Sequence, residues 1–148
     1  MSDKLKVLFL CTGNACRSQM AEAFARELKG CNIEPFSAGV IAAGILPGTI
    51  QVMQEIGYDL TGQYSKQLHE LEGVDFDWVV TLCDYARQIC PLFPGRTKVV
   101  HRGFDDPPTL AMNAKSDEQA LDHYRRVRDD IKAFIETLPE ALRNQTEG

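Results

Sequence analysis

The chain has no uncharged segment that suits a membrane helix. The long uncharged segment Phe36–Gln54 contains three glycines and a proline. We therefore expect a strand, a loop and a helix start there rather than a membrane span. The first residues, Met1-Ser2-Asp3-Lys4, lack the apolar core of a signal peptide. These absences predict a cytoplasmic protein that does not contact membranes.

The sequence also lacks an excess of basic residues. It has 16 Lys and Arg against 21 Asp and Glu, which gives a net charge of −5. This balance argues against a nucleic-acid partner. A local anion site remains compatible with it, because a helix N-terminus beside one arginine creates its own positive field. Internal repeats, low-complexity segments and linkers are absent, so we expect residues 1–148 to form a single domain.

Cysteine, in contrast, is abundant for a cytosolic chain of 148 residues. The five cysteines are Cys11, Cys16, Cys31, Cys83 and Cys90. A reducing compartment disfavours structural disulfides, and an odd number cannot pair completely. Catalytic or metal-binding roles are therefore favoured for some of these thiols.

Short apolar segments alternate with amphipathic ones along the chain. The expected strands are Lys6–Leu10, Ile33–Ser37, Asp77–Leu82 and Lys98–His101, and the expected helices are Ser18–Leu28, a segment from Pro47 to Gly57, and a long helix after Ser116. This alternation predicts an α/β fold with a four-stranded parallel sheet flanked by helices. Ligands of such folds bind where the carboxyl ends of the strands meet. The segments expected at that edge are Cys11–Ser18, Cys83–Cys90 and Gly103–Pro108.

Helical spacing also predicts which side chains enter the core. In the second helix these are Thr49, Val52, Met53 and Ile56, and in the long helix they are Tyr124, Val127, Ile131, Phe134, Ile135 and Leu138. Ser116 and Gln119 have the spacing of a capping box at the start of the long helix. We expect Arg125, Arg126 and Arg128 to lie on its solvated face.

The segment CTGNACRS, from Cys11 to Ser18, lies between a predicted strand and a predicted helix. Backbone N–H groups of such a loop can converge on a tetrahedral oxyanion. Gly13 allows a positive φ or close approach to the anion, and Asn14 tolerates a left-handed conformation and can brace the loop. Arg17 offers two donors to anion oxygens, while Ser18 can donate to a thiolate. Cys11 is thus a candidate nucleophile, with a buried structural cysteine as the alternative.

CTGNACRSQMAE resembles the active-site loop of the low-molecular-weight protein tyrosine phosphatase superfamily. Ser37-Ala38-Gly39 and Asp106-Pro107 extend this resemblance over nearly the whole chain. The resemblance implies Cys11 as nucleophile, Arg17 as anion clamp and Asp106 as general acid. It also implies an anion-binding loop that consists of Thr12, Gly13, Asn14, Ala15, Cys16, Arg17 and Ser18.

VVTLCDYARQICP, which contains Cys83 and Cys90, resembles the thioredoxin-coupled arsenate reductases of this superfamily, as does HRGFDDP. Gln19 and Pro108 stand where its phosphatases commonly have proline and tyrosine. The resemblance implies reduction of arsenate to arsenite by a relay in which Cys83 and then Cys90 resolve the bond to Cys11. It further implies thioredoxin as reductant, phosphate or sulfate as substrate mimics, and no cofactor. We expect a monomer.

Several alternatives remain at this stage. The protein could be a low-molecular-weight tyrosine phosphatase, or a redox-sensing or metal-binding adaptor without catalysis. Cys83, Cys90 and His101 could form a zinc site, although the spacing of the two cysteines is unusual and a fourth ligand is unclear. Cys16 is expected to serve packing, and Cys31 to be incidental. If the relay operates, Asp84–Ile89 should form a short helix in the reduced protein that loosens on oxidation.

One position departs from a metal site of the resembled reductases. Some of them bind potassium through residues that correspond to Asn14, Glu22 and Ser37, together with an acid at the position of Lys66. A lysine ammonium is a compact cation. We therefore expect Lys66 to approach Glu22 and to replace the potassium ion, so that no metal is bound.

Overall fold

The computed structural model describes residues 4–93 and 95–143 and contains one parallel sheet. Its strands are β1 (Leu5–Cys11), β2 (Ile33–Gly39), β3 (Trp78–Thr81) and β4 (Lys98–His101), in the order β2-β1-β3-β4. The helices are α1 (Arg17–Lys29), α2 (Pro47–Glu55), the 3₁₀ helix η1 (Leu68–Leu71), α3 (Asp84–Ile89), α4 (Pro107–Ala111), α5 (Asp117–Glu136) and α6 (Glu140–Arg143). The predicted four-stranded parallel α/β fold is confirmed.

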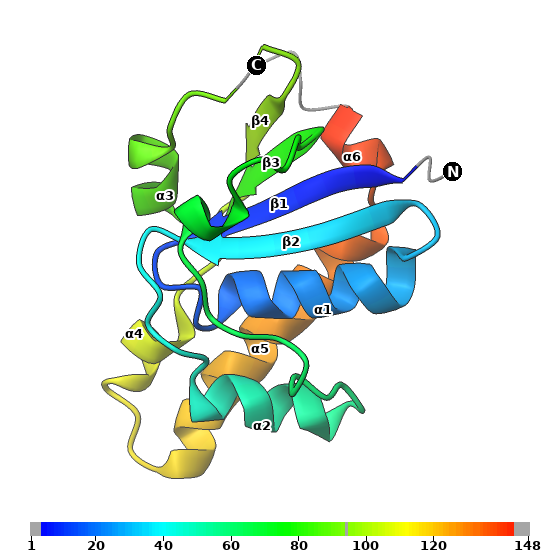
Figure 1. Ribbon diagram of the computed structural model, residues 1–148. Helices are drawn as coiled ribbons and strands as arrows, with labels where there is room; N and C mark the ends of the chain where they lie inside the picture. Colours follow the sequence, from blue (N-terminus) through cyan, green and yellow to red (C-terminus); the bar gives the residue numbers. More distant parts are fainter. Residues whose placement is uncertain (1–3, 94, 144–148) are drawn as a thin grey trace.

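The two longest helices lie together on one side of the sheet (Figure 1). Helix α1 packs against β1 and β2, and α5 packs against α1. Ser37 of β2 faces α1, because its hydroxyl donates to the carboxylate of Glu22 at 2.5 Å. Side chains alternate along a strand, so the neighbouring Phe36 points to the other side. There its ring meets Phe76 edge-on, with centroids 5.3 Å apart.

The uncharged segment Phe36–Gln54 forms the end of β2, a loop and most of α2, as predicted. Helix α2 buries Thr49, Val52 and Met53, but Ile56 lies beyond its end and is 38% exposed. The expectation that Ile56 enters the core was therefore wrong. The helix ends at Glu55, so Ile56 is no longer helical and helical spacing does not direct its side chain to the core. Gly57 follows with a positive φ.

Helix α5 corrects two further expectations. The Ser116 hydroxyl accepts from the Gln119 N–H at 3.1 Å, but the Gln119 side chain caps Lys115 rather than Ser116. Arg128 is buried rather than solvated. It donates to the Val52 carbonyl at 2.9 Å and also pairs with an acid of α2, so a cation on this helix joins it to a distant segment.

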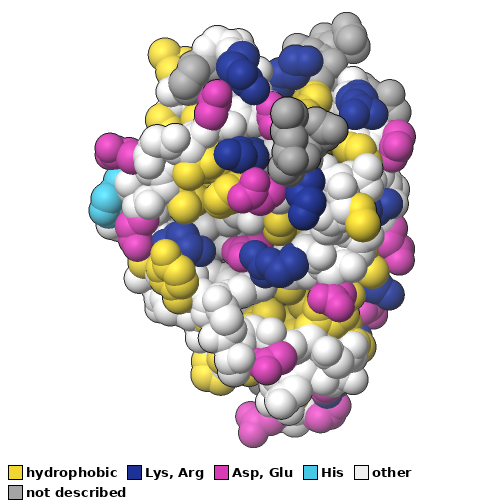
Figure 2. All heavy atoms as spheres, turned by 45° about the vertical axis from the view of Figure 1, so that its right-hand side comes forward, with side chains coloured by type: hydrophobic (Ala, Val, Ile, Leu, Met, Phe, Trp, Pro, Cys, Tyr) yellow, Lys and Arg dark blue, Asp and Glu magenta, His cyan; other side chains and the backbone are white. Residues whose placement is uncertain are grey.

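The surface carries charges of both signs. In Figure 2, basic and acidic side chains alternate on the face shown, and apolar side chains are exposed between them. Among residues 4–93 and 95–143, no helix has the length and apolar character needed to cross a membrane.

Candidate active site

The Cys11–Ser18 loop joins the end of β1 to the start of α1. Cys11 is the last residue of β1, and Arg17 is the first residue of α1. Cys11 is buried, and its Sγ lies 2.8 Å from the Ser18 hydroxyl oxygen. The hydrogen bond expected between Ser18 and the candidate nucleophile is therefore formed, at the N-terminus of a long helix.

Asn14 braces this loop from within. Its φ of 50° is left-handed, as predicted. Its side-chain N–H donates to the Ser18 hydroxyl at 2.8 Å. Its side-chain oxygen accepts from the Gln19 amide at 2.8 Å and from the Lys66 N–H at 2.9 Å. Gln19 is fully buried, and its side-chain oxygen accepts from the Gln63 amide at 2.7 Å. The sequence indicated Gln19 only as a difference from the phosphatases, but in the structure it supports the loop.

Two glycines allow neighbouring segments to approach the loop closely. Gly13 does not belong to the residues with a positive φ, and a Cβ there would lie 3.1 Å from the Cβ of Ala43. Close approach to a neighbouring segment, rather than a positive φ, explains Gly13. At Gly39, a Cβ would lie 2.7 Å from the Asn14 nitrogen, which is too close for any side chain. Gly39 thus permits β2 to pass directly beneath the loop.

Arg17 connects the loop to the segment before α4. Its Nη1 donates to the Phe104 carbonyl at 3.0 Å, and its Nη2 lies 3.2 Å from a carboxylate oxygen of Asp106. The other Asp106 oxygen accepts from the Thr109 hydroxyl at 2.6 Å. The neighbouring Asp105 points elsewhere and pairs with Arg126 of α5 at 2.9 Å. Only Asp106 of the two aspartates is therefore directed to the anion clamp.

Cys83 lies at the rim of the same site. It forms the N-cap of α3, where its Sγ accepts from the Ala86 N–H at 3.5 Å. Its Sγ is also 3.2 Å from the Thr12 hydroxyl oxygen. A cavity of about 330 Å³ opens here, lined by Arg17, Cys83, Asp84, Gly103, Phe104, Asp105 and Asp106. The three segments expected to converge at the sheet edge do meet.

Cys90 does not reach this cavity. It is the C-cap of α3, at the opposite end of that helix from Cys83, and it is partly buried. Burial raises the pKa of its thiol. All five cysteines are free, and α3 spans the predicted Asp84–Ile89. Among the residues that the structure describes, no three His, Cys, Asp or Glu side chains lie close enough together to hold a metal ion. The structure therefore gives no set of ligands for the zinc alternative.

Cys16 and Cys31 differ in their surroundings. Cys16 is buried within the loop, and burial raises the pKa of its thiol from 9.0 to about 12. This thiol stays protonated at neutral pH, which fits the packing role expected for it. Cys31 is exposed just after α1.

Lys66 occupies the position where the sequence suggested a cation. Its Nζ donates to the Ser37 carbonyl at 3.2 Å and to the Tyr64 carbonyl at 3.0 Å. Burial lowers the pKa of Lys66, while the charge of Glu22 acts in the opposite direction. The ammonium thus contacts two carbonyl oxygens, whereas the Glu22 carboxylate accepts from the Ser37 hydroxyl and pairs with Arg26.

Comparisons with known proteins find relatives that match most of the chain. A curated arsenate reductase from Halalkalibacterium halodurans is 41% identical to the chain, and the match covers 93% of the chain and 97% of that protein. A second, from Shouchella clausii, is 42% identical over 95% of the chain and 98% of that protein. A solved arsenate reductase in the phosphate-binding state is 32% identical, with a TM-score of 0.71 over 90% of this chain and 95% of that one. YwlE arginine phosphatase from Geobacillus stearothermophilus is 27% identical, with a TM-score of 0.71 over 95% and 94%. The model of the low molecular weight phosphotyrosine protein phosphatase family matches residues 6–147, and the chain belongs to this family.

Proposed function

We propose that the protein reduces arsenate to arsenite through Cys11, Cys83 and Cys90, with thioredoxin as the external reductant. The observation that carries this proposal is the 3.2 Å contact between Cys83 Sγ and the Thr12 hydroxyl. Hydrolysis of a phosphate ester needs one thiol and an acid, whereas this contact holds a second thiol at the anion loop. The names of the curated relatives support the same substrate.

In the first step, the thiolate of Cys11 attacks arsenic. The loop N–H groups and Arg17 hold the arsenate oxygens, as they would hold phosphate. An arsenic–sulfur bond forms and an arsenic–oxygen bond breaks. Asp106 gives a proton to the departing oxygen, which leaves as water.

In the second step, the thiolate of Cys83 attacks the sulfur of Cys11. A sulfur–sulfur bond forms while the sulfur–arsenic bond breaks, and its electron pair stays on arsenic. Arsenic(V) thus becomes arsenic(III) and leaves as arsenite, while two thiols are oxidised to a disulfide. The position of Cys83 beside Thr12 supports this order of attack.

In the third step, Cys90 attacks the sulfur of Cys83 and releases Cys11 as a thiolate. The two ends of α3 must approach for this exchange. Seven residues at a rise of about 1.5 Å each place them roughly 10 Å apart along the helix, whereas a disulfide needs Cα atoms within about 7 Å. Helix α3 must therefore unwind, and a dithiol protein then reduces the Cys83–Cys90 bond. We propose that this cycle operates in the reducing cytoplasm.

The proposal is tested by NADPH consumption with arsenate, thioredoxin and thioredoxin reductase. The proteins compared are the wild type, Cys11→Ser, Cys83→Ser and Cys90→Ser, with Cys31→Ser as a matched control. We expect the first three substitutions to stop sustained turnover and the control to behave as the wild type. Arsenate-dependent NADPH use that survives the loss of Cys83 would overturn the relay.

A second candidate is hydrolysis of phosphomonoesters, because Asp106 lies at Arg17 in the anion site. The same variants are assayed with para-nitrophenyl phosphate. Weak hydrolysis that requires Cys11 but not Cys83 or Cys90 is expected beside arsenate reduction. Fast hydrolysis together with no arsenate-dependent NADPH use would identify a phosphatase instead.

A further inference from the structure

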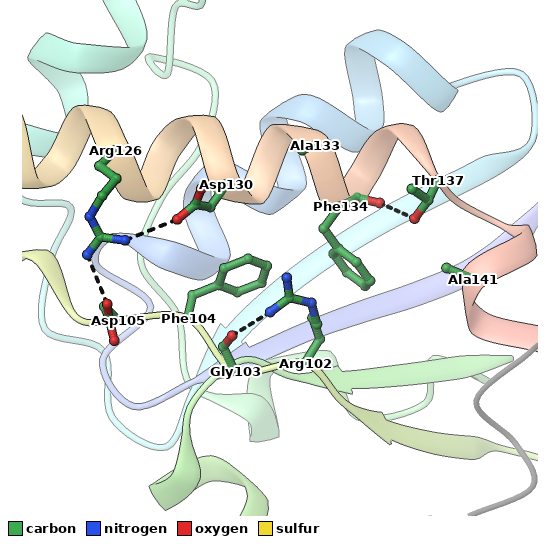
Figure 3. Close-up of a pocket in the computed structure, with 10 residues that line it drawn as sticks. All are labelled: Arg102, Gly103, Phe104, Asp105, Arg126, Asp130, Ala133, Phe134, Thr137 and Ala141. Carbon is green, nitrogen blue, oxygen red and sulfur yellow. Dashed lines mark hydrogen bonds and ion pairs between the residues drawn. The ribbon is translucent and has the colours of Figure 1, made fainter.

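A second cleft lies behind the segment that carries Asp106. It has a volume of about 550 Å³ and is bounded by the residues after β4, by α5 and by the start of α6 (Figure 3). This volume is within the range of small-molecule sites, about 300–1,000 Å³. The short side chains of Ala133 and Ala141 border it and leave its interior open.

Arg102 supplies a cation at this cleft. Its guanidinium lies 4.5 Å from the ring centre of Phe104 and 5.7 Å from that of Phe134. Its Nη1 donates to the Gly103 carbonyl at 2.8 Å, and no acidic side chain in the described ranges forms an ion pair with it. The rings therefore hold the guanidinium in place while its remaining donors stay available to a ligand.

Arg126 shows the opposite situation at the other end of the cleft. It pairs with Asp105 at 2.9 Å and with Asp130 at 3.1 Å, so its charge is already compensated (Figure 3). Among the described residues that line the cleft, Arg102 is thus a cation without an acidic partner, Arg126 is neutralised, and Phe104 and Phe134 supply two aromatic rings. This combination suits a ligand with a single negative charge and a flat apolar body.

We propose that this cleft binds a small aromatic carboxylate. The carboxylate accepts hydrogen bonds from the Arg102 guanidinium, whose fork geometry matches its two oxygens. The aromatic body packs along the edges of Phe104 and Phe134, because the guanidinium already lies over their faces, and edge-on ring contacts are favourable.

The cleft is physically connected to the anion site. Gly103, Phe104 and Asp105 line both cavities. The Phe104 side chain faces the cleft, while its carbonyl accepts from Arg17 at 3.0 Å. A ligand that presses on the Phe104 ring therefore changes the anchor of the anion clamp. Binding in the cleft and binding of phosphate in the Cys11 loop are coupled, and the coupling is reciprocal.

The test is a titration of the ¹⁵N-labelled protein with 1-naphthoate, followed by amide chemical shifts in saturating phosphate. We expect shifts at residues 102–105 and 133–141 that persist because phosphate already occupies the Cys11 loop. Arg102→Gln should weaken naphthoate binding by about tenfold, the loss expected for a charged hydrogen bond. Arg87 is an exposed arginine of α3, so Arg87→Gln removes the same charge at another place on the surface. This control variant should bind naphthoate with the affinity of the wild type. The neutral 1-naphthalenemethanol should bind more weakly than naphthoate.

Three results would overturn the proposal. One is a set of shifts confined to residues 12–18 that disappears with phosphate, and another is unchanged affinity in both Arg102→Gln and Phe134→Leu, each verified as folded by its melting curve. The third is a phosphate affinity that is identical with and without naphthoate. None of these readouts depends on arsenate reduction, so they remain informative if the proposed relay fails.

Discussion

Adjacent aspartates with different partners allow the general acid to be tested one side chain at a time. Asp106 lies at Arg17, whereas Asp105 pairs with Arg126 on the surface. Asp106→Asn should lower kcat for para-nitrophenyl phosphate and for arsenate by roughly 10²–10⁴, the usual contribution of a positioned acid. Asp105→Asn removes only an exposed ion pair and should change kcat by less than about threefold. Equal losses in both variants would contradict the assignment of Asp106.

Cys16 should make stability sensitive to alkaline pH. Below pH 9 the thiol is protonated in both the folded and the unfolded state. Between 9.0 and about 12 the unfolded chain loses this proton while the folded chain keeps it, so the free energy of unfolding falls as pH rises. Urea unfolding below and above pH 9 should show a smaller alkaline loss in Cys16→Ala than in the wild type. An equal loss in both would show that Cys16 does not titrate in this way.

Helix α3 is the element that the proposed relay must change. It is short, and Cys83 and Cys90, the proposed resolving cysteines, cap its ends. Oxidation to the Cys83–Cys90 disulfide should unwind it, because an intact helix keeps the two residues too far apart. Hydrogen exchange should therefore become faster at Ala86–Cys90 in the oxidised protein, with little change in α1.

Two controls separate this effect from general loosening. Oxidant-treated Cys83→Ser can form neither the Cys11–Cys83 nor the Cys83–Cys90 bond and should keep the exchange rates of the reduced protein in α3. Equal protection of α3 in reduced and oxidised wild type would contradict the proposed third step.

The elements that could be predicted are those specified by local signals. Pro47 and Gly57 mark the limits of α2. The helix at Asp84–Ile89, in contrast, was expected from the proposed relay and not from a local signal. Arg128 could not be predicted in the same way, because its burial depends on the Val52 carbonyl, 76 residues earlier in the chain. The loop residues Cys11, Arg17 and Ser18 were identifiable because their chemistry is local. The supports Gln19 and Gln63 were not, because they act across a fold that local pattern cannot specify.

At the scale of the whole molecule, the loops of the candidate site meet at one edge of the sheet, and Lys66 connects the anion loop to strand β2. Its backbone N–H donates to Asn14 of the anion loop, while its ammonium donates to the Ser37 carbonyl of β2. We propose that this cation, which the chain itself supplies, lets the site do without an ion from solution. Its contribution to stability should then not depend on which monovalent salt is present.

Melting temperature should therefore be the same in potassium chloride and in sodium chloride at equal ionic strength. Lys66→Met keeps an apolar stem of similar length but leaves the Ser37 and Tyr64 carbonyls without their donor. It should lower the free energy of unfolding by about 1–3 kcal/mol, the usual cost of buried groups that lose their hydrogen bonds. If Lys66 stands in for a potassium ion, added potassium should restore part of that loss in the variant alone. A potassium-specific gain in the wild type would instead show that the protein binds the ion despite its lysine.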